Sequence, residues 1–459
     1  MTTEQVEGKV RETLHAVALD RVRAPGDLVE KVMRRRGRRR AALAAGSVAA
    51  VVAIAAGAAL GYGGDGARQD RPARPAVSPT AAKATPPDGW QPWRSNVPGA
   101  GERGCLVDGS ALYCAGSAYD AAKFDAGTGA RLWTVKVNRE GDGIDHPFGV
   151  LDGVVFAYRN HTSQNQPDGD YAGGTDLMAV DAADGKVLWT AKMPQDDRTG
   201  QAAMVIDGAV LANTPSLRTV SALDPRTGQT KWSHGWDKGT VCQRAVLSGV
   251  PYLLCSPDTE EPAGTDVVRL DPASGRAVKV TTLPGRQELM GTSKDRMFLF
   301  HTDDPTATAA GEGRVTTLNG SGQRTSHPYR VQGQAATSAI VGDRLITVSF
   351  AGKASAYSLT TGTVLWSRPV GVDVPDPNAM PGMASPVGSP KRGVVYFFGP
   401  GGDVSALDLR TGAEVWRDHV DIGTPGPGLR GAPQVLLYGD ALIARNDSKL
   451  VSLLPPIGG

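Results

Sequence analysis

The stretch ALDLRTGAEVW, at residues 406–416, is the clearest of seven copies of one phrase in this chain. The other copies are KFDAGTGARLW (123–133), AVDAADGKVLW (179–189), ALDPRTGQTKW (222–232), RLDPASGRAVK (269–279), TLNGSGQRTS (317–326) and YSLTTGTVLW (357–366). Their glycines follow one another at intervals of 40 to 56 residues. A repeat of about 40–50 residues with strand-like sequence is typical of the blades of a β-propeller.

Each part of the phrase has a physical role in a sheet. The aspartate can accept hydrogen bonds from backbone N–H groups in a turn, and the glycine tolerates the positive φ of a tight hairpin. The tryptophan, four residues beyond the glycine, must pack against the next blade, because one blade cannot bury its ring. These tryptophans are Trp133, Trp189, Trp232, Trp366 and Trp416. Lys279 and Ser326 take this position in the other two copies, and we expect looser packing in those two blades.

The two ends of the repeat region indicate how the ring closes. The last copy is followed by QVLLYGDALIARNDSKLVSLL (434–454), which predicts three strands without a tryptophan strand. The segment around Trp93 supplies a tryptophan strand without a blade. Pairing the two completes an eighth blade and closes the ring. We therefore predict an all-β, eight-bladed β-propeller over residues 90–459, with seven blades as the alternative if 317–326 does not end a blade.

The repeated phrase resembles that of pyrroloquinoline-quinone-type propellers, over essentially all of residues 90–459. The resemblance implies a membrane-anchored bacterial protein with this fold, and it raises the alternative of a quinoprotein dehydrogenase that holds pyrroloquinoline quinone and Ca²⁺. Enzymes of that family carry two adjacent cysteines, and no such pair occurs here. The seven histidines are scattered, and no nucleophile elbow, HExxH helix or phosphate loop is present. We therefore predict no catalytic residues, no cofactor and no bound metal, with a divergent quinoprotein oxidoreductase as the alternative.

The four cysteines fall into two pairs with similar surroundings. Cys105 and Cys114 bracket CLVDGSALYC, and Cys242 and Cys255 bracket CQRAVLSGVPYLLC. If Gly109-Ser110 and Ser248-Gly249 are two-residue turns, the members of each pair lie opposite each other across a hairpin, within disulfide range. An even number of cysteines in an oxidising compartment favours two local disulfides. The alternative is two pairs of reduced thiols in the core.

The N-terminal part of the chain predicts a membrane anchor. Residues 1–40 hold 11 Lys and Arg against 6 Asp and Glu, and the following 41–62 carry no charge. About 22 helical residues span roughly 33 Å, close to the thickness of the hydrocarbon core. By the positive-inside rule, the basic tail is cytoplasmic and the propeller lies outside. A cleaved export signal and a buried soluble helix are the alternatives. Residues 63–89, rich in proline and alanine, predict an extended linker.

Composition and loops together indicate binding rather than catalysis. A net charge of +2 argues against a dedicated nucleic-acid binder. Long polar insertions at 159–175, 302–313 and 371–385 interrupt the blade rhythm, and loops carry function more often than blade cores do. We predict a non-catalytic, membrane-anchored scaffold or sensor that binds an unknown protein or envelope ligand on a propeller face. A second alternative is signalling through the tail, which resembles those of membrane-bound anti-sigma factors but has no cysteine.

Overall fold

The repeated phrase spans the turn between the third and fourth strands of a four-stranded antiparallel sheet, and the part of the chain that the structure describes contains eight such sheets. The computed structural model describes residues 83–137, 146–162, 173–194, 203–302, 312–330, 335–376, 382–423 and 433–456. The predicted basic tail (1–40), the predicted transmembrane helix (41–62) and the predicted linker up to residue 82 lie outside the described residues. Within those residues, no helix is long and apolar enough to span a membrane.

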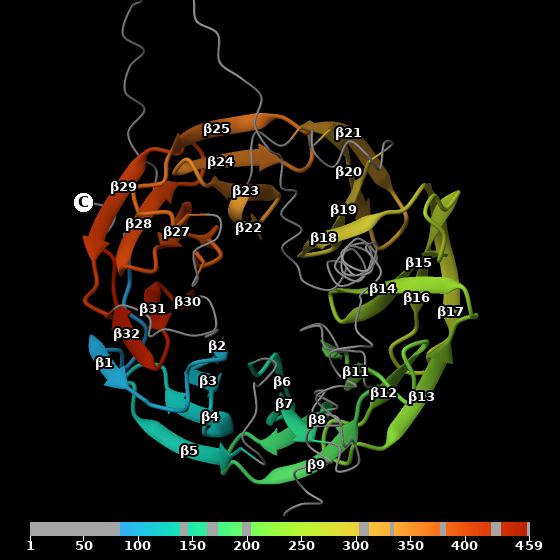
Figure 1. The fold of residues 1–459 in the computed structure, drawn as a ribbon, viewed down its shortest axis with the longest axis horizontal. Coiled ribbons are helices and arrows are strands. Elements are labelled where there is room, and N and C mark those ends of the chain that lie inside the picture. Colours follow the sequence, from blue (N-terminus) through green and yellow to red (C-terminus); the bar gives the residue numbers. More distant parts are fainter. Residues whose placement is uncertain are drawn as a thin grey trace, which may run out of the picture. The chain divides into compact units, whose positions relative to one another are not determined.

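The sheets are the blades of a propeller, arranged around a central axis with their first strands innermost (Figure 1). Blade 1 consists of β2 (Gly104–Asp108), β3 (Ala111–Ala115), β4 (Tyr119–Asp125) and β5 (Arg131–Lys136), and blade 2 of β6 (Gly149–Leu151), β7 (Val154–Thr162), β8 (Gly173–Asp181) and β9 (Val187–Lys192). Blade 3 consists of β10 (Ala203–Ile206), β11 (Ala209–Asn213), β12 (Thr219–Leu223) and β13 (Thr230–Gly235), and blade 4 of β14 (Thr240–Leu247), β15 (Val250–Pro257), β16 (Gly264–Leu270) and β17 (Ala277–Pro284).

Blades 5 to 8 continue the same strand order around the ring. Blade 5 consists of β18 (Glu288–Ser293), β19 (Arg296–His301), β20 (Glu312–Asn319) and β21 (Arg324–Arg330), and blade 6 of β22 (Ala335–Val341), β23 (Arg344–Ser349), β24 (Lys353–Ser358) and β25 (Val364–Pro369). Blade 7 consists of β26 (Val387–Ser389), β27 (Val394–Phe398), β28 (Asp403–Asp408) and β29 (Glu414–His419), and blade 8 of β30 (Gln434–Tyr438), β31 (Ala441–Asn446), β32 (Lys449–Leu453) and β1 (Trp93–Asn96). The innermost strands of neighbouring blades contact one another around the whole ring.

Blade 8 combines strands from opposite ends of the propeller sequence. Strand β1 pairs antiparallel with β32, so that Trp93 lies opposite Ser452 and Asn96 opposite Lys449. Figure 1 shows the blue β1 beside the red β32. The predicted eight-bladed closure is confirmed. The seven-bladed alternative is wrong, because β20 and β21 pair as the outer half of a complete blade although no tryptophan marks it.

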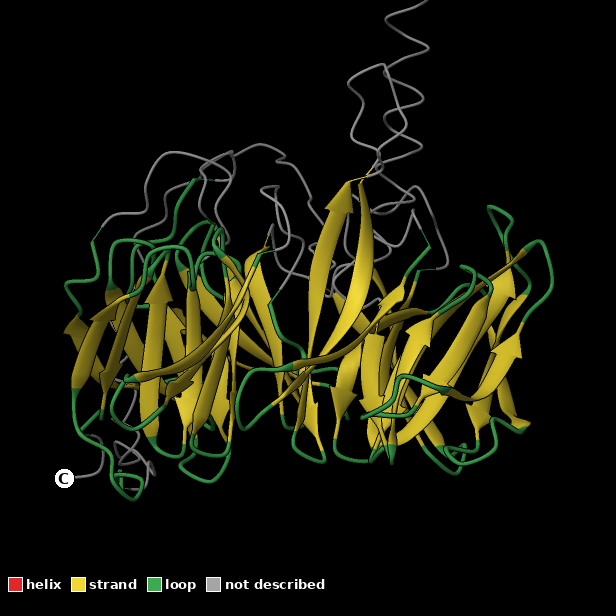
Figure 2. Cartoon of the chain, turned by 90° about the horizontal axis from the view of Figure 1, so that it is seen from below, coloured by secondary structure: helices red, strands yellow, loops and turns green. Residues whose placement is uncertain are grey.

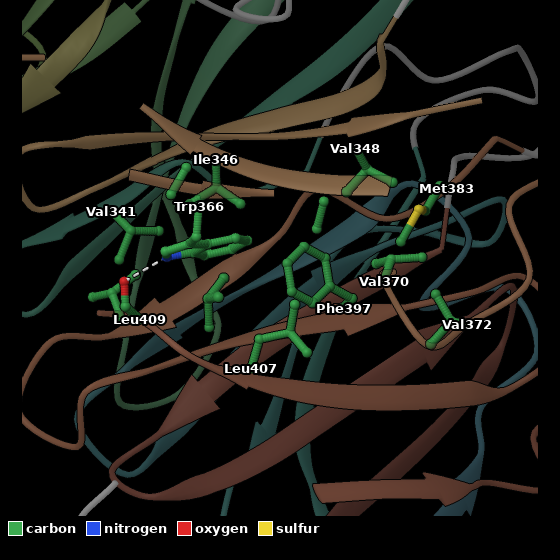
Figure 3. Close-up of a cluster of buried hydrophobic side chains, with 13 residues drawn as sticks. Val341, Ile346, Val348, Trp366, Val370, Val372, Met383, Phe397, Leu407 and Leu409 are labelled. Carbon is green, nitrogen blue, oxygen red and sulfur yellow. Dashed lines mark hydrogen bonds between the residues drawn. The ribbon is translucent and has the colours of Figure 1, made fainter. Parts of the chain in front are cut away.

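The hydrophobic core lies between the blades, and the tryptophans anchor it. Trp366, only 5% exposed, packs with Ile346 of its own blade and with Phe397 and Leu407 of the next (Figure 3). Its indole N–H donates to the backbone oxygen of Leu409 at 3.0 Å. Four other indoles donate in the same way to backbone oxygens of the next blade: Trp93 to Ala126, Trp133 to Ala182, Trp189 to Pro225 and Trp232 to Pro272.

A turn glycine of the next blade lies under each of these five rings. A methyl group added at that glycine would come within 2.5–2.8 Å of the ring, and the glycine itself has a φ between 68° and 79°. The five pairs are Trp93 with Gly129, Trp133 with Gly185, Trp189 with Gly228, Trp232 with Gly275 and Trp366 with Gly412. The repeated glycine therefore serves both the backbone conformation of its turn and the close approach of the indole.

Other side chains take this position in the two blades without a tryptophan. Val280 lies against Gly322, with its Cγ1 3.0 Å from where a Cβ would be, and His327 lies in the same way against Gly362. The register of the outer strands explains the change. In blade 7 a β-bulge leaves Val415, the residue directly before Trp416, without a pairing partner on β28. In blade 4 the unpaired residue of the bulge is Val280 itself, and in blade 5 the pairing of β20 with β21 has no bulge. Neither Lys279 nor Ser326 is the residue that covers the glycine.

The repeated aspartates belong to the turns that hold these glycines. In blade 7, Asp408 accepts hydrogen bonds from the backbone N–H of Thr411 at 2.7 Å and from its hydroxyl at 2.8 Å. Asp224 and Asp271 accept the same pair of bonds in their own turns. The backbone hydrogen bond from Thr227 lowers the pKa of Asp224, and the hydroxyl of Ser274 lowers that of Asp271. These carboxylates thus shape the turns between the third and fourth strands.

Candidate binding surfaces of the propeller

The two faces of the ring differ in the length of their connections. One face, which we call the turn face, carries the turns between first and second and between third and fourth strands, none longer than six residues. The opposite loop face carries the remaining connections, including the three predicted insertions and the crossings from β5 to β6 and from β29 to β30. In Figure 2 the loop face is uppermost, and several of its described loops extend further beyond the strand ends than the turns on the lower face do. Part of each insertion (163–172, 303–311 and 377–381) lies outside the described residues.

The chain enters and leaves the ring on the turn face. The backbone N–H of Thr85 donates to Asp440 at 2.8 Å, within the first turn of blade 8, and the indole of Trp90 donates to Ser452 at 2.9 Å. Residues 83–92, which we call the strap, therefore cross the end of blade 8 before β1 begins. The last part of the predicted linker is in contact with the propeller, and the loop face lies on the side away from this entry.

A buried ion-pair cluster lies at the start of β4, close to the loop face. Asp120 is fully buried, and its carboxylate lies 2.8 Å from Arg159 of blade 2 and 3.7 Å from Arg103, which precedes β2. A buried charge is tolerated only with such partners, since its desolvation costs several kcal/mol. The cluster joins blade 1 to blade 2 through Arg159, which lies in β7 of the long β7–β8 hairpin.

Two further buried arginines hold blade 8 to its neighbours. Arg392 donates to the hydroxyl of Tyr396 at 2.6 Å and to the backbone oxygen of Asp440 at 3.3 Å, and burial raises the pKa of that tyrosine to about 12. On the other side, Arg445 donates to the backbone oxygen of Gly101 at 2.9 Å. Burial lowers the pKa of Arg445 to about 10, which leaves it charged at neutral pH. These bonds connect blade 8 to blades 7 and 1.

A groove of about 400 Å³ lies between the outer strands of blades 7 and 8. Its walls come from β29, β32 and β1, and its lining residues are Pro92, Trp93, Arg94, Asp418, His419, Val420, Val451, Ser452 and Leu453. In blades 1 to 7 a turn joins the third and fourth strands, but in blade 8 these strands are β32 and β1, which no turn connects. The groove therefore lies at the one described blade without that turn, and the repeat pattern does not predict it.

The two predicted disulfides are present in the structure. Cys105 pairs with Cys114 across β2–β3, and Cys242 with Cys255 across β14–β15, the corresponding hairpin three blades further on. The Cα atoms are 4.0 Å and 4.1 Å apart, as expected for directly opposed residues in an antiparallel pair. The first pair is fully buried, whereas Cys242 and Cys255 are half-buried. Access to the two bonds therefore differs.

We expect mild reductant to open Cys242–Cys255 in the native protein well before Cys105–Cys114. Thiol exchange requires a thiolate to reach a sulfur atom, and the buried bond is shielded until blade 1 opens. The measurement is alkylation at timed intervals followed by mass spectrometry of the two cysteine peptides. In denaturant the two bonds should open at similar rates. Simultaneous opening in the native state would contradict this interpretation of the burial.

The described residues offer little support for a quinone-calcium centre. All four cysteines are paired across hairpins, so none is available for the adjacent pair found in quinoprotein dehydrogenases. Across the described ranges, no group of three or more His, Cys, Asp or Glu residues comes together to hold a metal ion. The repeated aspartates accept hydrogen bonds within their own turns. These residues do not fit the cofactor, and we derive no reaction step through it.

The structure has eight four-stranded blades, and the N-terminal strand closes the ring. Tryptophan–glycine contacts join five of the eight neighbouring pairs of blades. These features define a propeller of the pyrroloquinoline-quinone-repeat class. The family model described as outer membrane protein assembly factor BamB matches residues 78–242, 117–322 and 263–458. These matches extend over the whole propeller, and the chain belongs to that family.

Solved structures resemble this chain at low sequence identity. BamB from Moraxella catarrhalis is 14% identical with a TM-score of 0.49, covering 78% of this chain and 98% of its own. The computationally designed Ika8 protein is 12% identical with a TM-score of 0.49, covering 78% of this chain and 97% of its own. No curated protein sequence matches the chain.

Proposed function

We propose that this chain is a membrane-anchored, non-catalytic propeller that binds a protein or envelope ligand through its loop face. Residues 41–62 cross the membrane once, the basic tail stays in the cytoplasm, and the propeller lies outside. The observation that carries the proposal is the separation of the two faces. The chain enters on the turn face through the strap, and all connections longer than six residues lie on the opposite face.

Two further observations support this function. Two paired disulfides are expected in proteins of oxidising compartments, which agrees with a propeller outside the cytoplasm. The family model is described as an outer membrane protein assembly factor, and this description supports a binding role towards other proteins. Loops held on a rigid ring are also a common arrangement for recognition. No cofactor is required for this activity.

The proposal is tested first by location. In the full chain expressed in bacteria, the protein should stay in the membrane pellet after alkaline washing, and added protease should digest the propeller in spheroplasts but not the tail. Both disulfides should be intact in protein alkylated before any reductant is added. A propeller protected from external protease, with four free thiols, would overturn the proposed location.

Binding is tested by photo-crosslinking residues placed on the two kinds of surface. Leu217, 41% exposed in the loop between β11 and β12, reports on the loop face, and Val364, 44% exposed on outer strand β25, is the matched control. We expect one identified envelope protein to be cross-linked at residue 217 and not at residue 364. Equal capture at both sites would contradict loop-face binding.

The alternative of a quinoprotein oxidoreductase has a direct test of its own. The purified full chain is titrated with pyrroloquinoline quinone and Ca²⁺, and dye-linked turnover of alcohols and sugars is followed. We expect neither saturable binding nor turnover. Observing both would replace the scaffold function with a catalytic one.

A further inference from the structure

The groove between blades 7 and 8 combines an apolar floor with an acidic wall. Trp93, Val420 and Val451 are each less than a tenth exposed and form its floor. On the β29 side, Asp418 lines the groove as an exposed carboxylate. Asp403 lies 2.8 Å from the ring of the lining residue His419, and Asp421 directly follows the lining residue Val420. The opposite wall carries a single arginine, Arg94, which lies 4.0 Å from Asp421. An extended peptide with cationic side chains beside apolar ones complements this surface.

The predicted linker contains such a segment close to the propeller. Residues 68–77 read RQDRPARPAV, with arginines at positions 68, 71 and 74 and prolines at 72 and 75. Proline-rich sequence favours the polyproline II helix, which has three residues per turn. Arginines spaced by three therefore lie along one edge of that helix, followed by Val77 on the same edge. Grooves lined by aromatic side chains recognise this kind of helix in other proteins.

The length of the chain allows this segment to reach the groove. The strap begins at Lys83 and is fixed at Thr85 to Asp440, in the turn that joins β30 to β31. Strands β32 and β1 are the next two strands of the same sheet, at spacings of about 4.8 Å each. The six residues from Val77 to Lys83 extend over as much as about 20 Å. That distance is greater than the two strand spacings that separate β31 from β1.

We infer that the groove between blades 7 and 8 binds residues 68–77 of the same chain. The three arginines and Val77 lie along the β29 wall, with the arginines near its carboxylates, and the prolines at 72 and 75 cover the floor around Trp93. Docking of this segment shortens the part of the linker that stays free, and it keeps the turn face of the propeller towards the predicted membrane anchor. This inference depends on the groove and the linker sequence and is independent of the proposed function.

The test measures disulfide formation between two introduced cysteines in the full chain. Val77→Cys is combined with His419→Cys, at the end of β29, or with Lys136→Cys, at the end of β5 in blade 1. The two partner sites occupy the same strand position on opposite sides of blade 8, and the native cysteines are already paired. We expect the 77–419 pair to form at least about tenfold faster than the 77–136 pair, as a modest docking free energy would give. Equal rates would overturn the inference.

Charge variants then separate docking from simple tethering. R68A/R71A/R74A should reduce the 77–419 rate to that of the control pair, whereas R68K/R71K/R74K should keep most of the difference, because the wall carries point charges. Added salt should weaken the preference, since exposed charges are screened. A preference that survives the alanine variant would contradict docking through the arginines. Cross-linked dimers in place of intramolecular bonds would show that the groove takes the linker of a second copy, which would also overturn docking within one chain.

Discussion

Replacing Trp366 with alanine is expected to lower the free energy of unfolding by about 3–5 kcal/mol. The ring is 5% exposed, lies on Gly412 of the next blade, and donates to the backbone oxygen of Leu409. Its removal leaves a cavity between blades 6 and 7. The backbone oxygen of Leu409 also loses the indole as a hydrogen-bond donor and keeps only the Arg344 guanidinium. Urea and thermal midpoints of the purified protein measure the loss.

Trp416→Ala is the matched control for this prediction. It lies at the same position of the repeat, but it is half-buried and faces blade 8, where no turn joins β32 to β1. We expect a loss of about 1–2 kcal/mol, within the range of ordinary substitutions. Equal losses for Trp366 and Trp416 would show that tryptophan size alone, and not the glycine contact, stabilises the ring.

The fold was predictable because the repeat reports the same local chemistry in every blade. Asp408, Gly412 and Trp416 in one copy predict a turn and an outer strand, and the period of the copies predicts a ring. The disulfides followed for the same reason, since Cys105 and Cys114 are separated by one short hairpin. What the repeat could not predict was the bulge that moves Val280 into the place of tryptophan, because bulge position depends on pairing along the whole strand.

The candidate surfaces were less accessible to sequence reasoning. The groove is lined by Trp93 together with Val420 and Val451, and each of these two valines is more than 300 residues away from Trp93 in the chain. Asp120 and Arg392 look like ordinary surface charges in the sequence, and only the packing of neighbouring blades buries them. Arg445 carried one usable signal, because it interrupts the apolar run ALIARN of a predicted core strand. A charged residue at such a position points to a specific buried partner.

The closing strand connects the fold to the proposed function. The same segment that completes blade 8 also attaches the propeller to the predicted membrane anchor, so that pairing between β1 and β32 would carry any load on the linker. The strap, Arg392 and Arg445 all add bonds at this blade. The junction between the two ends of the chain is therefore held by backbone pairing and by buried hydrogen bonds on both sides.

Deleting residues 1–96 is expected to abolish the folded monomer, whereas deleting residues 1–82 is expected to leave the propeller intact. The longer deletion removes the partner of β32 and the Trp93 ring on Gly129, and exposes a sheet edge that invites aggregation. Losing the tryptophan contact alone costs about 3–5 kcal/mol, a large part of the 5–15 kcal/mol typical of a folded domain.

Size-exclusion chromatography and circular dichroism of the two truncated proteins measure the difference. Rescue gives the decisive control: moving residues 90–96 behind Pro456 through a Thr-Gly turn supplies blade 8 with the covalent turn that the other blades have. This rearranged chain should recover the monomer, because the same strand then pairs with β32 from the other end of the chain. The protein that lacks residues 1–96 could instead form a stable monomer that melts at the same temperature as the protein that lacks residues 1–82. That result would show that pairing of β1 with β32 does not stabilise the closed ring.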